Sequence, residues 1–352
     1  MCGIAGFINL SSDFDSKTVL PLMTKKLTHR GPDDEGHWYH PEFKLALGHR
    51  RLSILDLSPL GHQPMTSHSG RFVITFNGEI YNFQNLKNEL VGYPFRGNSD
   101  TEVMLAAFEK WGVEKSVPKF TGMFAFAVLD TQEKTLYIYR DRLGEKPLYY
   151  GWVNGSFVFA SELKAIRVFP GFNNPISQRA TELFFQFSYV PTPFSIYEGI
   201  FKLPPGTFVK LELPLANRIE PTPIKFWDPS EKLARSKKIE ITSSLATKTL
   251  DDMLFKTISQ QMISDVPLGA FLSGGVDSSV VTAIMSKISS KPINTFTIGF
   301  SESDYDETKA ARQTANYLNT NHTELFFNSK DALDLIPRLG QIYDEPFADS
   351  SQ

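Results

Sequence analysis

The sequence is poor in cysteine, in long apolar runs and in excess charge of either sign. Cys2 is the only cysteine in 352 residues, which excludes an intrachain disulfide and gives no sign of secretion. No apolar run approaches the ~20 residues that a membrane-spanning helix needs, and the N-terminus lacks the charged and apolar regions of a signal peptide. The 36 Lys+Arg nearly balance the 39 Asp+Glu, so neither nucleic acid nor a membrane is expected as a partner. We expect a cytoplasmic protein.

The length and the order of apolar runs predict two domains. A chain of 352 residues exceeds one ordinary core and suggests domains of ~100–200 residues each. Up to about residue 200, strand-like runs such as RFVITFNGEIY (71–81) and TLYIYRD (135–141) alternate with turn signals. Ser99 and Glu102 have the spacing of a capping box, and Gly112 stands where a helix ends, so a helix is expected over 99–112. Residues 1–205 are predicted to form a layered α+β domain.

The composition changes after this first domain. Six prolines lie between residues 204 and 229 and KLARSKK (232–238) is basic, which is typical of a solvated linker with edge strands over 206–243. A buried strand in VPLGAFL (266–272), a helix through VVTAIMSKI (280–288) and a strand in INTFTIGF (293–300) then follow one another. Strands that alternate with helices imply right-handed crossovers and a parallel sheet. Residues 244–352 are therefore predicted to form an α/β domain.

The thiol at position 2 has two interpretations. Methionine before a small residue is normally trimmed, which would leave Cys2 with a free α-amine. Such an amine has a reference pKa of ~7.7–8 and can take the proton of its own thiol, so one residue would supply both nucleophile and base. The alternative is a lone cysteine that packs as a small apolar side chain, although a chain end rarely lies deep in a core. The cysteine alone does not separate the two.

Seven motifs in the first half carry a resemblance. They are MCGIAGF (1–7), HRGPDDEG (29–36), GHRRLSILDLSPLGHQPM (48–65), FNGEIYN (76–82), NSDTE (98–102), GMFAFAVLD (122–130) and RDRLGEKPLYYG (140–151). Together and in this order they resemble the class II glutamine amidotransferases, N-terminal-nucleophile hydrolases that release ammonia from glutamine. The resemblance covers roughly residues 1–200. It implies a layered αββα sandwich with Cys2 as the nucleophile.

The same resemblance implies roles for the residues of a glutamine pocket. Attack on the side-chain amide of glutamine creates an oxyanion that fixed donors must stabilise. These donors would be the Asn77 side chain and the Gly78 backbone N–H. Arg51 would hold the α-carboxylate, since its planar fork matches that group, and Asp100 would hold the α-ammonium with help from Glu79. The remaining implied pocket residues are Leu52, Ser53 and Ile54.

Two alternatives stay open for these charged residues. Arg51 or Asp100 taken alone would indicate a surface ion pair of little consequence, but within these motifs the substrate role is favoured. Arg50 is the immediate neighbour of Arg51, and only the likeness to the family favours the latter.

The histidines do not indicate a metal site. Six of the seven lie before residue 69, namely His29, His37, His40, His49, His62 and His68. They lack the spacing of zinc ligands, and no HExxH motif occurs. We expect them to be hydrogen-bonding residues of loops.

The stretch FLSGGVDSS (271–279) follows a predicted strand and opens a predicted helix. Its glycines and serines leave backbone N–H groups bare at a helix N-terminus, which suits an anion. It is not a Walker loop, because GxxxxGK[ST] and its lysine are missing. Taken alone, a pair of glycines would indicate only a turn without a ligand.

The whole S-G-G-x-D-S pattern resembles the PP-loop of ATP pyrophosphatases. The resemblance implies that the pyrophosphate of ATP is held by Ser273, Gly274, Gly275, Asp277 and Ser278. Asp277 would also be a ligand of Mg²⁺, an oxygen donor beside phosphates. Leu272 and Ile298 would contact the adenine, although apolar residues at strand ends usually belong to the core.

A class II glutaminase followed by a PP-loop domain resembles the glutamine-hydrolysing asparagine synthetases. The resemblance implies glutamine, aspartate and ATP as partners, a glutamyl thioester on Cys2, and an acyl-adenylate that ammonia converts to an amide. A homodimer is left open. The alternatives are an amidotransferase that acts on another carboxylate, such as a sugar acid in surface polysaccharide synthesis, and a catalytically silent protein that keeps the fold.

One departure from the family concerns the C-terminal part. The family's synthetase domain continues past YDEPFADSS (343–351) and carries a second motif, S-G-E-G-x-D-E, which this sequence lacks. We therefore expect a C-terminally incomplete synthetase that hydrolyses glutamine but makes the amide poorly or not at all.

Overall fold

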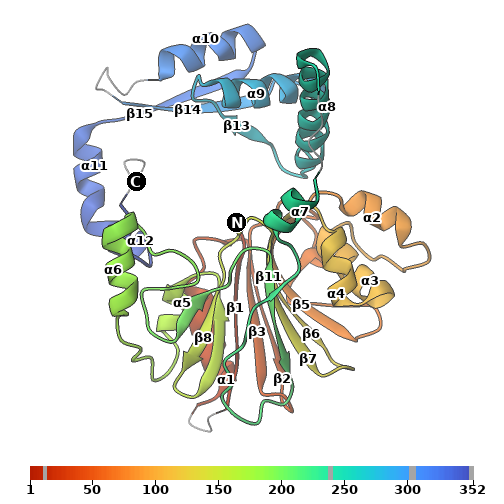
Figure 1. The fold of residues 1–352 in the computed structure, drawn as a ribbon, viewed down its shortest axis with the longest axis vertical. Helices are drawn as coiled ribbons and strands as arrows, with labels where there is room; N and C mark the ends of the chain where they lie inside the picture. Colours follow the sequence, from red (N-terminus) through yellow and green to blue (C-terminus); the bar gives the residue numbers. More distant parts are fainter. Residues whose placement is uncertain (11–13, 237–240, 301–306, 349–352) are drawn as a thin grey trace. The chain divides into compact units, whose positions relative to one another are not determined.

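The computed structural model describes residues 1–10, 14–236, 241–300 and 307–348. The chain divides into two compact units, Met1–Arg235 with Tyr343–Gln352, and Ser236–Ile342 (Figure 1). These bounds differ from the predicted ones at 205/206 and 243/244. One reason is that strand β11 (Thr207–Glu212) pairs with β7 (Thr135–Arg140) in the first unit. The other is that Asp344 and Glu345 form ion pairs with lysines of that unit.

Two six-stranded antiparallel sheets build the first unit. The first sheet has the order β10-β8-β9-β1-β3-β2, with β1 (Gly3–Ile8), β2 (Asp34–His40), β3 (Leu45–Arg51), β8 (Tyr149–Val153), β9 (Ser156–Ala160) and β10 (Ile200–Lys202). The second has the order β12-β11-β7-β6-β5-β4, with β4 (Met65–Thr66), β5 (Phe72–Ile80), β6 (Gly122–Asp130) and β12 (Ile224–Lys225) beside β7 and β11. The predicted linker thus contributes two strands, β11 and the edge strand β12.

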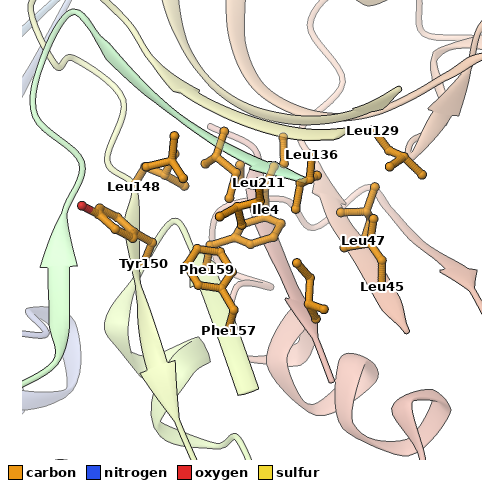
Figure 2. Packing of buried hydrophobic residues seen from close by; sticks show 14 of the residues in the cluster. Ile4, Leu45, Leu47, Leu129, Leu136, Leu148, Tyr150, Phe157, Phe159 and Leu211 are labelled. Atoms are coloured by element: carbon orange, nitrogen blue, oxygen red, sulfur yellow. The ribbon is translucent and has the colours of Figure 1, made fainter. Parts of the chain in front are cut away.

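Strand β1 shows how the sequence builds the core. Successive residues of a strand point to opposite faces. Ile4 and Ile8 face the core between the two sheets, whereas Ala5 and Phe7 face the core beneath helices α1 (Ser16–Lys25) and α5 (Leu163–Arg167). Figure 2 shows the inter-sheet core, in which Leu45, Leu47, Phe157 and Phe159 pack with Leu129, Leu136 and Leu211. Because β1 is buried on both faces, it fixes the chain that leads back to Cys2.

Helices α2 (Phe83–Glu89), α3 (Asp100–Trp111) and α4 (Val113–Ser116) belong to the side of the second sheet (Figure 1). Helix α3 begins and ends as expected: the Ser99 hydroxyl accepts the N–H of Glu102 at 3.3 Å, and Gly112 follows with a φ of 79°. Only half of the capping box forms, because the Glu102 carboxylate accepts the N–H groups of residues 96 and 97 instead. Helices outside and two sheets inside confirm the predicted αββα sandwich.

The second unit alternates helices and strands. Its helices are α8 (Ser243–Gln261), α9 (Val276–Ile288), α10 (Thr308–Leu318), α11 (Ser329–Leu335) and α12 (Leu339–Ile342), and its strands are β13 (Gly269–Phe271), β14 (Asn294–Phe300) and β15 (Asn321–Phe327). The strands form a parallel sheet with β14 in the middle, which confirms the predicted parallel arrangement. The prediction of a buried strand over 266–272 is wrong in extent and burial. Strand β13 has only three residues, and Phe271 at the edge of the sheet is 81% exposed.

The described part of the chain contains no helix that is both long and apolar enough to cross a membrane.

Candidate active site

Cys2 lies at the N-terminal end of β1 and opens onto a cavity of about 90 Å³. Its thiol contacts the backbone of Leu52, with Sγ 3.6 Å from the carbonyl oxygen and 3.4 Å from the nitrogen. The cavity is lined by most of the predicted glutamine-pocket residues, namely Cys2, Arg51, Leu52, Ile54, Asn77, Gly78, Glu79 and Asp100. Ser53 does not line it, and its N–H instead binds the Asp33 carboxylate at 2.7 Å.

The amide of Asn77 has no hydrogen-bond partner. The side chain is 1% exposed, and among the described residues neither its oxygen nor its nitrogen is satisfied. A buried polar group without a partner is costly and usually marks a site whose partner is a ligand. At Gly78 a β-carbon would come within 2.2 Å of the Met123 carbonyl oxygen, so only glycine lets the two strands meet here. A donor is therefore aimed at the cavity from a closely packed pair of strands.

The residue before Asn77 is held from both sides by buried side chains. The carbonyl oxygen of Phe76 lies 2.9 Å from Nε2 of His49, and its N–H donates to Oε1 of Gln63 at 2.7 Å. Burial lowers the pKa of His49 to about 4, so the imidazole is neutral. Because a carbonyl only accepts, the proton of this neutral ring sits on Nε2. These two contacts fix the strand that presents Asn77, and the sequence alone did not single out Gln63.

The two neighbouring arginines have different surroundings. Arg51 is 7% exposed and lines the cavity, and its guanidinium donates to the carbonyl oxygens of Ser58 and Leu55 at 3.2 Å each and to that of Asp56. These contacts use Nη1 and Nη2. Arg50 points elsewhere: it donates to Gly31 and forms an ion pair with Glu35 at 3.0 Å.

Two carboxyl groups face the same cavity. Asp100 is 5% exposed and accepts the N–H of Ile80 and of Thr101, each at 2.8 Å. Burial raises the pKa of Asp100 to about 7, and the nearby Glu79 adds to the rise. Burial also raises the pKa of Glu79, which the nearby Lys146 partly offsets. Two carboxyl groups whose charged forms are disfavoured by burial suit a cationic group of a ligand, because a bound cation favours the ionised carboxylate.

The pKa values of the Cys2 thiol and of the N-terminal amine are shifted in opposite directions. Burial raises the pKa of the Cys2 thiol and lowers the pKa of the N-terminal amine, which the structure places on Met1. A buried thiol therefore needs a base, and a buried amine close to it holds its proton weakly. Removal of Met1 would take this amine away and expose a new α-amine on Cys2 itself.

Two cations at this end of the site were not predicted from the sequence. Nε of Arg30 donates to the carbonyl oxygen of Cys2 at 2.9 Å. Lys146 is 5% exposed, lines the cavity, and is held by its own N–H to the Asp141 carboxylate at 2.9 Å. Both lie in motifs that carried the resemblance, HRGPDDEG and RDRLGEKPLYYG. Their positions inside these motifs were the available signal in the sequence. Which groups the two cations contact depends on the fold.

The prediction that the histidines lie in loops is wrong for three of them. His37 and His40 belong to β2 and His49 to β3, because the pairing of these two strands extends through residues that are not β-rich. Among the described residues, no three His, Cys, Asp or Glu side chains are grouped so that they could hold a metal ion.

The SGGVDSS stretch forms a strand-to-helix turn. Gly275 caps α9, and Gly274 has a φ of 77°, where a β-carbon would meet that of Ala310 at 2.6 Å. The hydroxyls of Ser273 and Ser278 lie 3.1 Å apart, and the Asp277 side chain is exposed in the first turn of α9. A left-handed glycine before a helix start leaves N–H groups bare toward solvent, the arrangement that binds phosphate.

The two implied adenine contacts differ in burial. Leu272 is 1% exposed and packs with Ala311 and Ala315 in a small core. Ile298, on β14, is 48% exposed. The Leu272 side chain thus has the ordinary surroundings of a core residue.

A layered αββα fold with a cysteine at position 2 in its cavity defines the class of N-terminal-nucleophile hydrolases. Family models agree: residues 1–220 match the glutamine amidotransferase domain, and residues 249–352 match asparagine synthase. The chain belongs to the family of glutamine-hydrolyzing asparagine synthetases, as the sequence predicted.

Curated relatives align along nearly the whole chain. "Putative asparagine synthetase (glutamine-hydrolyzing) 2" of Methanocaldococcus jannaschii is 37% identical over 371 residues, which cover 100% of this chain and 70% of the relative. Asparagine synthetase (glutamine-hydrolyzing) 1 of Bacillus subtilis is 32% identical over 99% of this chain, which spans only 54% of the relative's length. Among solved structures, "Structure of the allosteric regulatory enzyme of purine biosynthesis" matches at 14% identity with a TM-score of 0.49, over 92% of this chain and 80% of that one, a likeness too loose to carry an argument.

Proposed function

We propose that the first unit hydrolyses glutamine with Cys2 as nucleophile and that the second uses the ammonia to amidate aspartate at the expense of ATP. The observation that carries the first half is the unpartnered Asn77 amide in the cavity that holds the Cys2 thiol. The names of the relatives and the two family models support the second half. We further expect a cytoplasmic location.

Glutamine hydrolysis proceeds in two steps on Cys2. The neutral α-amine takes the thiol proton, and the sulfur attacks the side-chain amide carbon of glutamine. The Asn77 amide and the Gly78 N–H stabilise the oxyanion. The C–N bond then breaks, the leaving nitrogen takes the proton, and ammonia departs from a glutamyl thioester. Water attacks the thioester, releases glutamate and returns the proton to sulfur.

The rest of the cavity selects free glutamine. Arg51 binds the α-carboxylate through the donors that its loop contacts leave over. Asp100 and Glu79 bind the α-ammonium, whose charge favours their ionised form. A charged group at each end of the substrate aligns its amide with the thiol, the main source of rate for a bound reactant.

The second unit activates the acceptor carboxylate. A carboxylate oxygen of aspartate attacks the α-phosphorus of ATP, pyrophosphate leaves, and an acyl-adenylate forms. Ammonia attacks the acyl carbon, the C–O bond to AMP breaks, and the amide nitrogen loses a proton. The bare N–H groups around Gly274 and Gly275 hold the pyrophosphate. The exposed Asp277 carboxylate fits a Mg²⁺ ion that would neutralise phosphate charge when bound.

One incubation tests this function. The chain is given glutamine, aspartate and Mg-ATP, and glutamate, AMP and asparagine are followed together, with Cys2→Ala as control. Glutamate with equal AMP and asparagine supports both halves. Glutamate without AMP and asparagine supports the hydrolysis of glutamine only. The chain is then incubated with a panel of other carboxylate acceptors, including sugar acids. Glutamate release that is unchanged in Cys2→Ala would overturn the nucleophile.

A further inference from the structure

The segment of residues 343–348 packs on the first unit through two buried carboxylates. It follows α12 in the sequence and falls inside the stretch that matches asparagine synthase. Asp344 accepts the N–H of Lys164 at 3.0 Å, and its other oxygen lies 3.6 Å from Nζ of the same lysine. Both side chains are largely buried, with 11% of Asp344 and 18% of Lys164 exposed.

Glu345 is bound still more closely. Its carboxylate accepts the N–H of Ile196 at 2.8 Å and the Tyr149 hydroxyl at 3.3 Å, and it lies 2.5 Å from Nζ of Lys202. The N–H of Ala348 donates to the carbonyl oxygen of Ser188 at 2.8 Å. Helix α5, strands β8 and β10 and the backbone at Ser188 and Ile196 therefore hold this segment, in which Glu345 lies 149 residues after Ile196.

A line of charges runs from this segment to the nucleophile. Nζ of Lys164 lies between Asp344 and Glu162, 3.0 Å from the latter. Glu162 in turn forms an ion pair of 2.8 Å with Arg30. Arg30 donates to the carbonyl oxygen of Cys2 at 2.9 Å. Asp344 stands at one end of the line and the Cys2 backbone at the other, and Glu162 also lies 3.0 Å from Nε2 of His29.

Burial makes this line sensitive to the loss of any member. Arg30 and Glu162 have side chains that are 7% and 16% exposed. Leaving a buried charge without a partner costs free energy, so the neighbouring charged side chains move to pair with it. Without Asp344, Lys164 would lose one of its carboxylate partners, and a shift of Lys164 toward Glu162 would weaken the pairing of Glu162 with Arg30. Arg30 is the side chain that holds the backbone of Cys2, and a displacement of ~1 Å at a reacting group costs up to ~10²-fold in rate.

We propose that Asp344 is a positioning residue for the hydrolysis of glutamine, acting through Lys164, Glu162 and Arg30 on the Cys2 backbone. Docking of the 343–348 segment thereby links the geometry of the nucleophile to the part of the chain that matches asparagine synthase. The inference rests on the proposed role of Cys2.

A double-mutant cycle tests the link. Asp344→Asn, Glu162→Gln and the double variant are compared with the full chain for kcat and KM of glutamine hydrolysis and for the rate at which iodoacetamide alkylates Cys2. Glu182→Gln serves as the matched control, since its carboxylate is exposed on helix α6 (Gln178–Phe187) and contacts Arg179 and Gln178 of the same helix. All assays run well below the melting temperature of the least stable variant.

The expected result is a ~10-fold loss of kcat in Asp344→Asn, within the range seen for coupled residues, with a parallel change in alkylation and an unchanged Glu182→Gln. The loss of kcat in the double variant should be no greater than the loss in Glu162→Gln alone. Losses that multiply in the double variant, or wild-type kcat and alkylation in Asp344→Asn, would overturn the proposal. If the unmodified chain released no glutamate, the proposed function would fail, and the alkylation rates would still decide whether Asp344 positions Cys2.

Discussion

Nε2 of His49 lies 2.9 Å from the carbonyl oxygen of Phe76, and the imidazole is fully buried. The contact fixes the strand immediately before Asn77 without using the Asn77 amide. The strand is thus held while its functional side chain stays free, which is how a preorganised donor is built.

Replacing that donor should separate activity from stability. We expect Asn77→Ala to lower kcat for glutamine hydrolysis by ~10²–10³ with little change in KM, as for other oxyanion donors. The melting temperature should not fall, because the buried amide has no partner to lose. Asn174→Ala is the converse control: its amide donates to two backbone carbonyls, so it should lose stability and keep kcat. A normal kcat in Asn77→Ala would exclude the oxyanion role.

Asp100 should make glutamine binding depend on pH. Its pKa of about 7 means that the ionised form, which binds the α-ammonium, is lost as the pH falls below neutrality. We expect KM to rise by ~10-fold per pH unit in that range, and Asp100→Asn to have a high KM that is flat with pH. A pH-dependent KM that persists in Asp100→Asn would assign the titration to another group.

The same residue should influence stability with a definite sign. The folded-state pKa of Asp100 is raised above the unfolded value of ~3.9, so its contribution to stability is greatest below that value and is lost as the pH rises toward 7. Asp100→Asn should therefore raise the melting temperature at pH 8 and change it little at pH 4. The check is thermal unfolding at both pH values, and equal shifts would contradict the expectation.

Arg51 and Arg50 form a matched pair for mutation. Arg51→Lys should raise KM for glutamine by ~10–100-fold, because the ammonium of lysine has too few N–H donors to keep the loop carbonyls and also bind a carboxylate. Arg50→Lys should leave KM within a factor of two, since Arg50 does not line the cavity and Glu35 can pair with either cation. Steady-state kinetics of both variants decide, and the opposite order would assign the carboxylate to Arg50.

The turn at Gly274 offers a test confined to the second unit. Gly274→Ala places a β-carbon at a φ of 77° and 2.6 Å from Ala310, so we expect ATP binding to be lost while glutamine hydrolysis continues. Gly340→Ala is the control, because nothing lies within 4 Å of its added β-carbon. Calorimetric titration with Mg-ATP measures both. Equal affinities in the two variants would count against a phosphate site at this turn.

The sequence predicts what depends on local pattern and misses what depends on tertiary contacts. The strand in TLYIYRD (135–141) and the caps of α3 each depend on residues close to one another in the sequence, so both were predicted. Lys146 and Gln63 stood inside recognised motifs, but only the fold brings them to the cavity. The ion pair of Lys164 with Asp344 joins residues 180 positions apart, and no periodicity in one sequence can indicate such a pair.

In the proposed function, Cys2 attacks glutamine after Met1 has been removed and carries a glutamyl thioester. The most direct measurement mixes the chain with glutamine, quenches in acid within one turnover, and determines the mass of the N-terminal peptide. We expect a peptide that begins at Cys2 and carries one glutamyl group, and we expect this group to be absent when the reaction is quenched after all the glutamine has been consumed. A peptide that retains Met1, or one that never carries the group while glutamate accumulates, would contradict it.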